Sequence, residues 1–156
     1  MAGIGKDRLH LAWVSSAEAQ RFVEIATAVT ESIQQQGKFD ADAFRMQLDA
    51  AERTLAGETL RWMVGKEYKI ITKGDVYGRP WDKDSYENVL NRTLEREYHK
   101  NLILTAIQAG STSPRIIAQT IGLDLKWISY LLADMERTNM VEFKGMEDRK
   151  PVFAVL

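Results

Sequence analysis

The chain contains no cysteine, only three prolines and only two histidines among its 156 residues. The lack of cysteine excludes disulfides and thiolate metal sites. The two histidines, His10 and His99, lie far apart in the sequence, and no spacing of ligands suggests a transition-metal site. No run of 18 or more apolar residues occurs, so no segment is predicted to span a membrane.

An excess of charge of one sign is also lacking, because 21 Lys and Arg stand against 22 Asp and Glu and give a net charge of −1. This balance provides no general attraction to nucleic acid or to an anionic membrane. The first 14 residues do not show the charged, apolar and cleavage regions of a signal peptide, so we expect a cytoplasmic protein. The hydrophobic fraction of 45% is that of an ordinary globular protein with a core.

Motifs that would indicate catalysis are missing as well. The stretch "GETLRWMVGKE" ends near a Gly-Lys pair, but its glycine spacing is wrong and Glu67 stands where a phosphate-binding loop needs Ser or Thr. The "GIG" at residues 3–5 is too short for a dinucleotide fingerprint. No nucleophile–base pair is visible, so we assign no catalytic residue and expect no catalytic activity from this chain alone.

Residues 1–37 show the pattern of a strand followed by a helix. The run "RLHLAWV" at residues 8–14 has the length of a strand, and Ser15 and Glu18 have the spacing of a capping box. Gly37 is expected to close the helix. A lone strand leaves its backbone groups unpaired, so either it pairs with another chain or the sequence is the C-terminal piece of something longer. The apolar stripe of the helix comprises Phe22, Ile25, Ala26, Val29 and Ile33.

Residues 38–97 are predicted to form a helical linker region. Asp40 can cap its first helix, and the short run "EYKIIT" at residues 67–72 leans toward a strand because of its β-branched residues. The stretch "KGDVYGRP" is typical of a turn. A further helix is expected to begin after Asp82 and can continue without a break to Gly110.

Residues 98–156 carry the clearest pattern, with an apolar helix ending at Gly110, a short helix opened by Ser113 and Pro114, and a turn at Gly122 before a third helix. Two short strands, "MVEF" and "VFAVL", follow. This order resembles a winged helix, so the predicted fold is mainly α (α+β), a helical region followed by a C-terminal winged helix-turn-helix domain. The predicted core comprises Ile103, Ile107, Ile116, Ile117, Ala118, Ile121, Ile128, Leu132, Met135, Val141, Phe143, Val152 and Phe153.

The third helix lacks the residues of a DNA reader on the face where we expect reading to occur. That face is predicted to carry Trp127, Tyr130 and Leu131, whereas base edges and phosphates require donors and cations. Large aromatic and apolar side chains anchor protein interfaces, so we predict that these three residues bind a protein partner. The alternative is that one or two of them pack in the core. The cations available for nucleic-acid binding are Arg115, Lys126, Arg137, Arg149 and Lys150.

The segment "GIGKDRLHLAWVSSAEAQRFVEIATAVTESIQQQGKF" resembles the closing strand and helix of the delta-subunit family of methyl-viologen-reducing hydrogenases. The resemblance rests on Arg8–Leu9, Leu11, Trp13, Ser15–Glu18 and Phe22. It implies electron transfer between hydrogenases, or other donors, and heterodisulfide reductase-like complexes. The family holds an iron–sulfur cluster on cysteines upstream of this segment, so a cluster is expected only in a missing upstream part and no cofactor is expected in this chain.

These observations predict an accessory C-terminal region of an electron-transfer subunit of a hydrogenase or heterodisulfide reductase-like complex, with the winged helix as a protein-docking module. Its partners would be protein subunits of a redox complex, and the parent complex would be an oxidoreductase. The first alternative is a winged-helix transcriptional regulator that binds nucleic acid. The second is a stand-alone homodimer whose two strands pair across a twofold axis.

Overall fold

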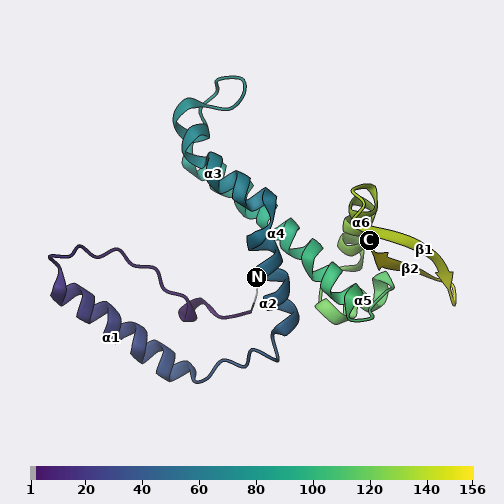
Figure 1. The fold of residues 1–156 in the computed structure, drawn as a ribbon, viewed down its shortest axis with the longest axis horizontal. Helices are drawn as coiled ribbons and strands as arrows, with labels where there is room; N and C mark the ends of the chain where they lie inside the picture. Colours follow the sequence, from purple (N-terminus) through teal and green to yellow (C-terminus); the bar gives the residue numbers. More distant parts are fainter. Residues whose placement is uncertain (1–2) are drawn as a thin grey trace. The chain divides into compact units, whose positions relative to one another are not determined.

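The computed structural model describes residues 3–156, and over these residues it contains six α-helices, one short 3-10 helix and one two-stranded antiparallel hairpin (Figure 1). The architecture is therefore mainly α with a small β part, consistent with a winged helix, which confirms the predicted fold class. The described residues divide into two compact units, residues 3–45 and residues 46–156. Within the described residues no single helix is long and apolar enough to cross a membrane, and the helices Pro114–Ile121 and Leu125–Arg137 qualify only as a pair bent by 118°.

The N-terminal unit contains the 3-10 helix η1 (Lys6–Arg8) and the helix α1 (Ala19–Gln36). The guanidinium of Arg8 donates hydrogen bonds of 3.0 Å to the carbonyls of Gln36 and Gly37, which ties the first turn to the end of α1. The predicted strand at residues 8–14 is wrong, because the extended chain that follows Arg8 finds no neighbouring strand among the described residues.

The expected capping box at the start of α1 forms only in part. The backbone N–H of Ser15 donates to the Glu18 carboxylate at 2.8 Å, but the Ser15 hydroxyl accepts from the N–H of Ala17 instead of closing the reciprocal bond. The regular helix therefore begins only at Ala19. The expected cap at Gly37 is present, with a φ of +68° that favours glycine.

Three helices open the second unit: α2 (Arg45–Ala56), α3 (Glu58–Lys73) and α4 (Lys83–Gln108). Residues 67–72, which were expected to lean toward a strand, are helical and belong to the last turns of α3. The carboxylate of Asp82 accepts from the N–H of Ser85 at 2.8 Å and caps α4, which runs unbroken for 26 residues as the pattern allowed. The amide of Asn101 donates to the buried hydroxyl of Thr54 at 3.0 Å and joins α4 to α2.

The winged helix comprises the C-terminal half of α4, α5 (Pro114–Ile121), α6 (Leu125–Arg137), β1 (Val141–Glu147) and β2 (Lys150–Val155). Gly122 has a φ of +70° in the left-handed region and permits the turn between α5 and α6. Two predicted core residues, Ile116 and Phe143, are instead 42% exposed, while Leu131 is fully buried. The predicted core residues that are buried are Ile103, Ile107, Ile117, Ile128, Leu132, Met135 and Val141.

The hairpin of β1 and β2, called the wing below, is longer than the sequence predicts. Glu147 pairs directly with Lys150, so the turn contains only Asp148 and Arg149, with φ values of +47° and +62°. Both residues thus adopt the left-handed conformation of a tight two-residue hairpin, which favours Asn, Asp or Gly. Most of the polar run at residues 144–151, which looked like a long loop, therefore belongs to the two strands.

Candidate interaction surfaces

Leu131 cannot serve as a docking residue, because its side chain is fully buried in the core of the winged helix. On α6, residues spaced by three or four positions share one face. Leu131 thus falls on the inner face together with Ile128, Leu132 and Met135, which are also buried. The prediction that Leu131 binds a partner is wrong. Of the three residues predicted to dock, Leu131 faces the core, so a docking face on α6 would consist of other residues.

Trp127 and Tyr130 lie beside α4. The indole N–H of Trp127 donates to Nδ1 of His99 at 3.0 Å, and its ring stacks on that of Tyr130 with centroids 5.3 Å apart and planes 14° apart. The guanidinium of Arg96 lies 5.6 Å from the centre of the Tyr130 ring. Tyr130 is nevertheless 53% exposed, so a partner can reach it, whereas Trp127 is half-buried.

Burial of the His99 imidazole lowers its pKa, and the nearby Glu95 carboxylate opposes this shift. The neutral imidazole is the form that can accept a hydrogen bond from the Trp127 indole. The aromatic contact between α4 and α6 therefore depends on an uncharged His99, which makes the contact sensitive to acid.

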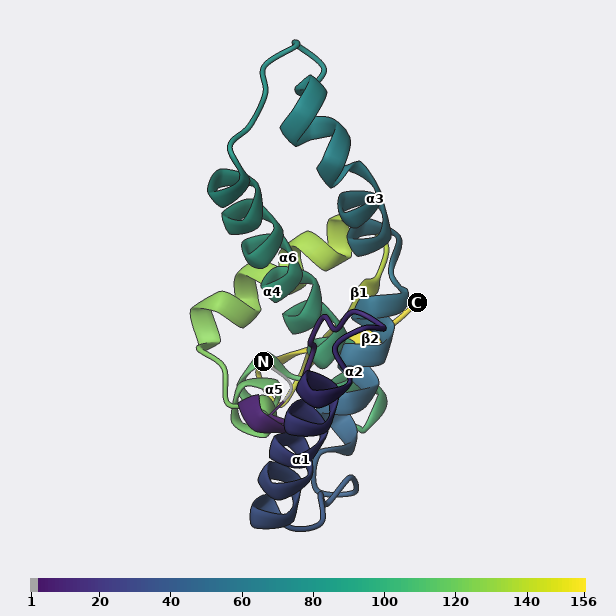
Figure 2. The ribbon, with the colours of Figure 1, turned by 90° about the vertical axis from the view of Figure 1, so that its left-hand side faces the viewer.

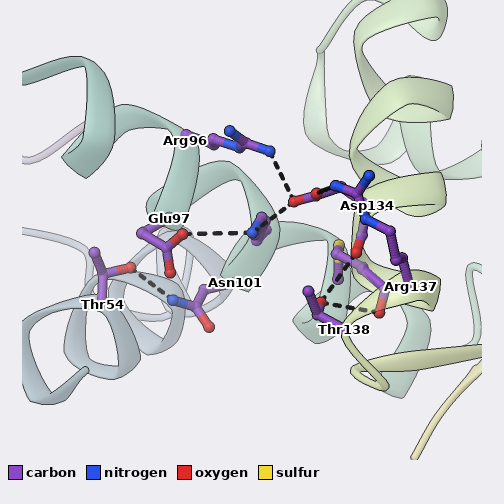
Figure 3. Close-up of polar contacts among 9 residues, drawn as sticks. Thr54, Arg96, Glu97, Asn101, Asp134, Arg137 and Thr138 are labelled. Atoms are coloured by element: carbon purple, nitrogen blue, oxygen red, sulfur yellow. Dashed lines mark hydrogen bonds and ion pairs between the residues drawn. The ribbon is translucent and has the colours of Figure 1, made fainter. Parts of the chain in front are cut away.

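A second contact between α4 and α6 is formed by charged groups around Asp134 (Figure 3). One carboxylate oxygen of Asp134 accepts from the Lys100 ammonium at 2.9 Å and from the Arg96 guanidinium at 2.8 Å, and the other accepts from Arg137. Hydrogen bonding from Lys100 is the main reason that the pKa of Asp134 lies far below its usual range; desolvation opposes the shift, and Arg137 and Arg96 add to it. The Lys100 ammonium also lies 3.5 Å from the Glu97 carboxylate.

The outer face of α6 differs from the one predicted. Its exposed positions repeat at helical spacing and combine the Tyr130 ring with small side chains and charges of both signs. The cations there do not form a uniform basic stripe, since Arg137 is paired with Asp134. The exposed residues of α6 are Leu125, Lys126, Ser129, Tyr130, Ala133, Glu136 and Arg137.

Three of the five cations predicted for nucleic-acid binding come together. Arg115 at the start of α5 lines a cavity of about 460 Å³ with Arg149 and Lys150 from the wing. Asp148 lines the same cavity and offsets part of their charge. The other two cations, Lys126 and Arg137, do not line this cavity.

The N-terminal unit exposes large apolar side chains. Leu9 and Leu11 are each 85% exposed and Trp13 is 82% exposed, while Phe22 and Val23 on α1 are 62% and 55% exposed. None of the described side chains between residues 3 and 45 is buried. The alternation of residues 9, 11 and 13 in the sequence is the signal that could have revealed this surface.

Over the described residues, no group of three or more His, Asp or Glu side chains is placed to hold a metal ion. Comparison of the chain with protein-family models, with curated proteins and with solved structures produced no match. The roles of the surfaces described above therefore follow from their own geometry.

Proposed function

We propose that this chain is a docking region of a larger redox assembly and that residues 3–45 bind another protein subunit. The observation that carries the proposal is that no described side chain in these residues is buried, although several large apolar ones are present. A segment without a core of its own gains stability when a partner covers its apolar side chains.

The exposed side chains can supply a substantial binding energy. Transfer of one large apolar side chain from water contributes about 1.5–3 kcal/mol. Covering Leu9, Leu11, Trp13 and Phe22 together would thus contribute on the order of 6–12 kcal/mol. Association costs a similar amount, about 4–15 kcal/mol, so additional main-chain contacts are needed for a stable complex.

Residues 9–14 can provide those main-chain contacts. Their backbone N–H and C=O groups form no hydrogen bond to any described residue, and Leu9 is already extended, with φ −121° and ψ 117°. Alternate apolar side chains on an extended segment suit addition to the edge of a partner's sheet. This mode of docking satisfies the unpaired groups that the isolated unit leaves open.

The resemblance of residues 3–39 to the hydrogenase delta-subunit family supports a particular class of partner. It favours subunits of a hydrogenase or heterodisulfide reductase-like complex, in which any iron–sulfur cluster would belong to another chain or another segment. In this proposal the winged helix is a second docking module, and exposed Tyr130 is its aromatic anchor.

The proposal is tested by purifying the full chain with its bound subunits from its native cells and comparing it with the variant Leu11→Asp/Trp13→Asp. Both positions are more than 80% exposed, so the isolated chain should keep its fold. We expect the variant to lose the bound subunits. The variant Thr27→Asp, which adds a charge at an exposed polar position of α1, is the control and should retain them.

Amide exchange provides an independent measurement. We expect the amides of residues 9–14 to exchange rapidly in the isolated chain and slowly in the complex. A monomeric chain in which these amides are strongly protected would contradict the proposal. A homodimer that dissociates when Trp13→Asp is introduced would instead favour the stand-alone dimer.

Nucleic-acid binding is the second candidate, and the cavity lined by Arg115, Arg149 and Lys150 favours it. Three phosphate contacts would give a slope of about −2.7 in a plot of log K against log salt concentration. A duplex titration at several salt concentrations measures this slope. Tight binding that is lost in Arg115→Ala, Arg149→Ala and Lys150→Ala would support the regulator over the docking region.

A further inference from the structure

A groove in the second unit is lined by residues of α3, of α4 and of the loop that joins them. Figure 2 shows the course of these two helices and their loop. Its volume is about 450 Å³, which is within the range of ligand-binding sites. Its lining is mostly apolar and includes three aromatic rings. The principal lining residues are Trp62, Ile70, Val76, Trp81, Tyr86 and Val89.

The floor of the groove is held in place by contacts between the two helices. The hydroxyl of buried Tyr86 on α4 donates to the carbonyl of Met63 on α3. The ring of Trp81 meets that of Tyr86 edge to face with centroids 6.5 Å apart, and its backbone N–H donates to the carbonyl of Ile70 at 3.4 Å. The aromatic wall is thus fixed by contacts within the chain itself.

The loop that forms the other wall is also fixed. The carboxylate of Asp75 accepts from the backbone N–H groups of Tyr77 and Arg79 at 2.8 and 3.1 Å, and from the Arg79 guanidinium at 2.9 Å. Partial desolvation would raise the pKa of Asp75, but these bonds outweigh it and lower the pKa to about 2. A Cβ at Gly74 would stand 2.7 Å from the backbone of Gly78, so glycine permits this turn. A preformed wall reduces the ordering cost of binding.

The rim of the groove remains exposed although it is apolar. Val76 is 92% exposed, Trp62 is 56% exposed and Val89 is 39% exposed. A small molecule that filled the groove would leave the outer surfaces of Val76 and Trp62 in water. A protein segment can cover the groove and its rim together, which makes a partner segment the better occupant.

The charge at one edge indicates the composition of that segment. Lys66 and Lys69 line the groove from α3, three residues apart and therefore on the same side of the helix. No ion pair joins either ammonium to a carboxylate among the described residues. The one carboxylate in the lining, that of Asp75, is engaged by Arg79. The edge is therefore positive and complementary to acidic side chains.

We propose that this groove binds an acidic amphipathic segment of a partner protein. The segment places a large apolar side chain against Trp62, Val76 and Trp81, and its carboxylates face Lys66 and Lys69. The groove lies outside residues 3–45, so this inference does not depend on the function proposed for that unit.

The test uses two fluorescein-labelled peptides and anisotropy titration of the full chain. One peptide has leucines at helical spacing flanked by glutamates, and the other has lysines in place of the glutamates. We expect the acidic peptide to bind about tenfold more tightly, as two or more attractive charge pairs allow. The variant Lys66→Glu/Lys69→Glu should reverse this preference. The variant Lys126→Glu/Lys150→Glu makes the same change in net charge at two positions of the second unit that do not line the groove, and should leave the preference unchanged.

A further variant, Val76→Asp, should weaken binding of the acidic peptide at least about tenfold, and its high exposure protects the fold, which circular dichroism verifies. Equal affinity for both peptides, or no binding of the acidic peptide at about 1 mM, overturns the proposal. Decanoate that binds more tightly than the acidic peptide and displaces it would identify a small-molecule site instead. A homodimer that Val76→Asp dissociates would assign the groove to a second copy of this chain.

Discussion

Replacement of Asp134 by Asn should destabilise the winged helix strongly at neutral pH. The substitution keeps the shape of the side chain but removes the charge that pairs with Lys100, Arg96 and Arg137. The Lys100 side chain is only 10% exposed, and it would keep only the Glu97 carboxylate, 3.5 Å away. The main cost is therefore an incompletely paired ammonium in a place that water hardly reaches.

The decrease in the free energy of unfolding depends on how exposed the side chains paired with Asp134 are. Removing one member of a buried pair costs about 3–5 kcal/mol. Arg96 and Arg137 are 37% and 78% exposed and can turn to water, so the lower end, about 3 kcal/mol, is expected. In a chain of this size 1 kcal/mol shifts the melting temperature by about 2–4 °C, so the predicted decrease is about 6–12 °C.

Urea and thermal unfolding, followed by circular dichroism at several pH values, measure this difference. The folded protein lowers the pKa of Asp134 below the value of about 3.9 in the unfolded chain. The wild type is therefore more stable than the variant by the full amount above about pH 3.9, and this difference in stability decreases as the pH falls below that value. The variants should therefore differ most at pH 5–7 and converge in stronger acid.

Two controls separate the charge network from a general effect of mutation. Glu136→Gln changes an exposed neighbour and should alter stability by less than about 0.5 kcal/mol. Asp134→Leu/Lys100→Met removes both charges of the pair and should be less destabilising than Asp134→Asn, because no buried ammonium remains. A loss below about 1 kcal/mol for Asp134→Asn at pH 7, or an equal loss in the double variant, would refute the reasoning.

Three further outcomes are expected. Leu131→Ala should lower the free energy of unfolding by about 2–5 kcal/mol in urea titrations because it leaves a cavity, whereas exposed Tyr130→Ala should cost less than about 1 kcal/mol; the opposite order would place Leu131 outside the core. Arg149→Gly should stabilise the wing by about 0.5 kcal/mol, since glycine adopts a φ of +62° without strain, and a lower melting temperature would contradict this. Because burial lowers the pKa of His99, unfolding experiments should show stability falling as the pH drops below about 6.5, and this part of the decline should be absent in His99→Gln.

The helices of this chain were largely predictable because their signals are local. Pro114 and Gly122 mark the ends of α5 in the sequence, and the carboxylate of Asp82 caps α4 where the pattern predicts its start. The predicted strand at residues 8–14 failed because strand formation requires a neighbour, and a run of alternating apolar residues does not provide one.

The face of α6 was less predictable because several apolar residues follow one another in it. In "WISYLL" more than one helical stripe can be drawn, and tertiary packing decides that Leu131 faces inward while Tyr130 stays exposed. The Asp134 cluster depends on residues 34 and 38 positions away, Lys100 and Arg96, and no local pattern links them. The hairpin turn was missed because Arg149 stands where such a turn favours glycine, although Asp148 suits the first position.

The unbroken course of α4 makes it a molecular ruler within the second unit. Tyr86, near its start, forms part of the groove, and Ile107, near its end, lies in the core of the winged helix. At about 1.5 Å per residue the two positions are held roughly 30 Å apart. A partner segment in the groove and a second molecule on the winged helix would accordingly be kept at a set spacing. Insertion of four residues after Arg92, where α4 is exposed, would lengthen that spacing by about 6 Å and turn one end relative to the other by about 40°.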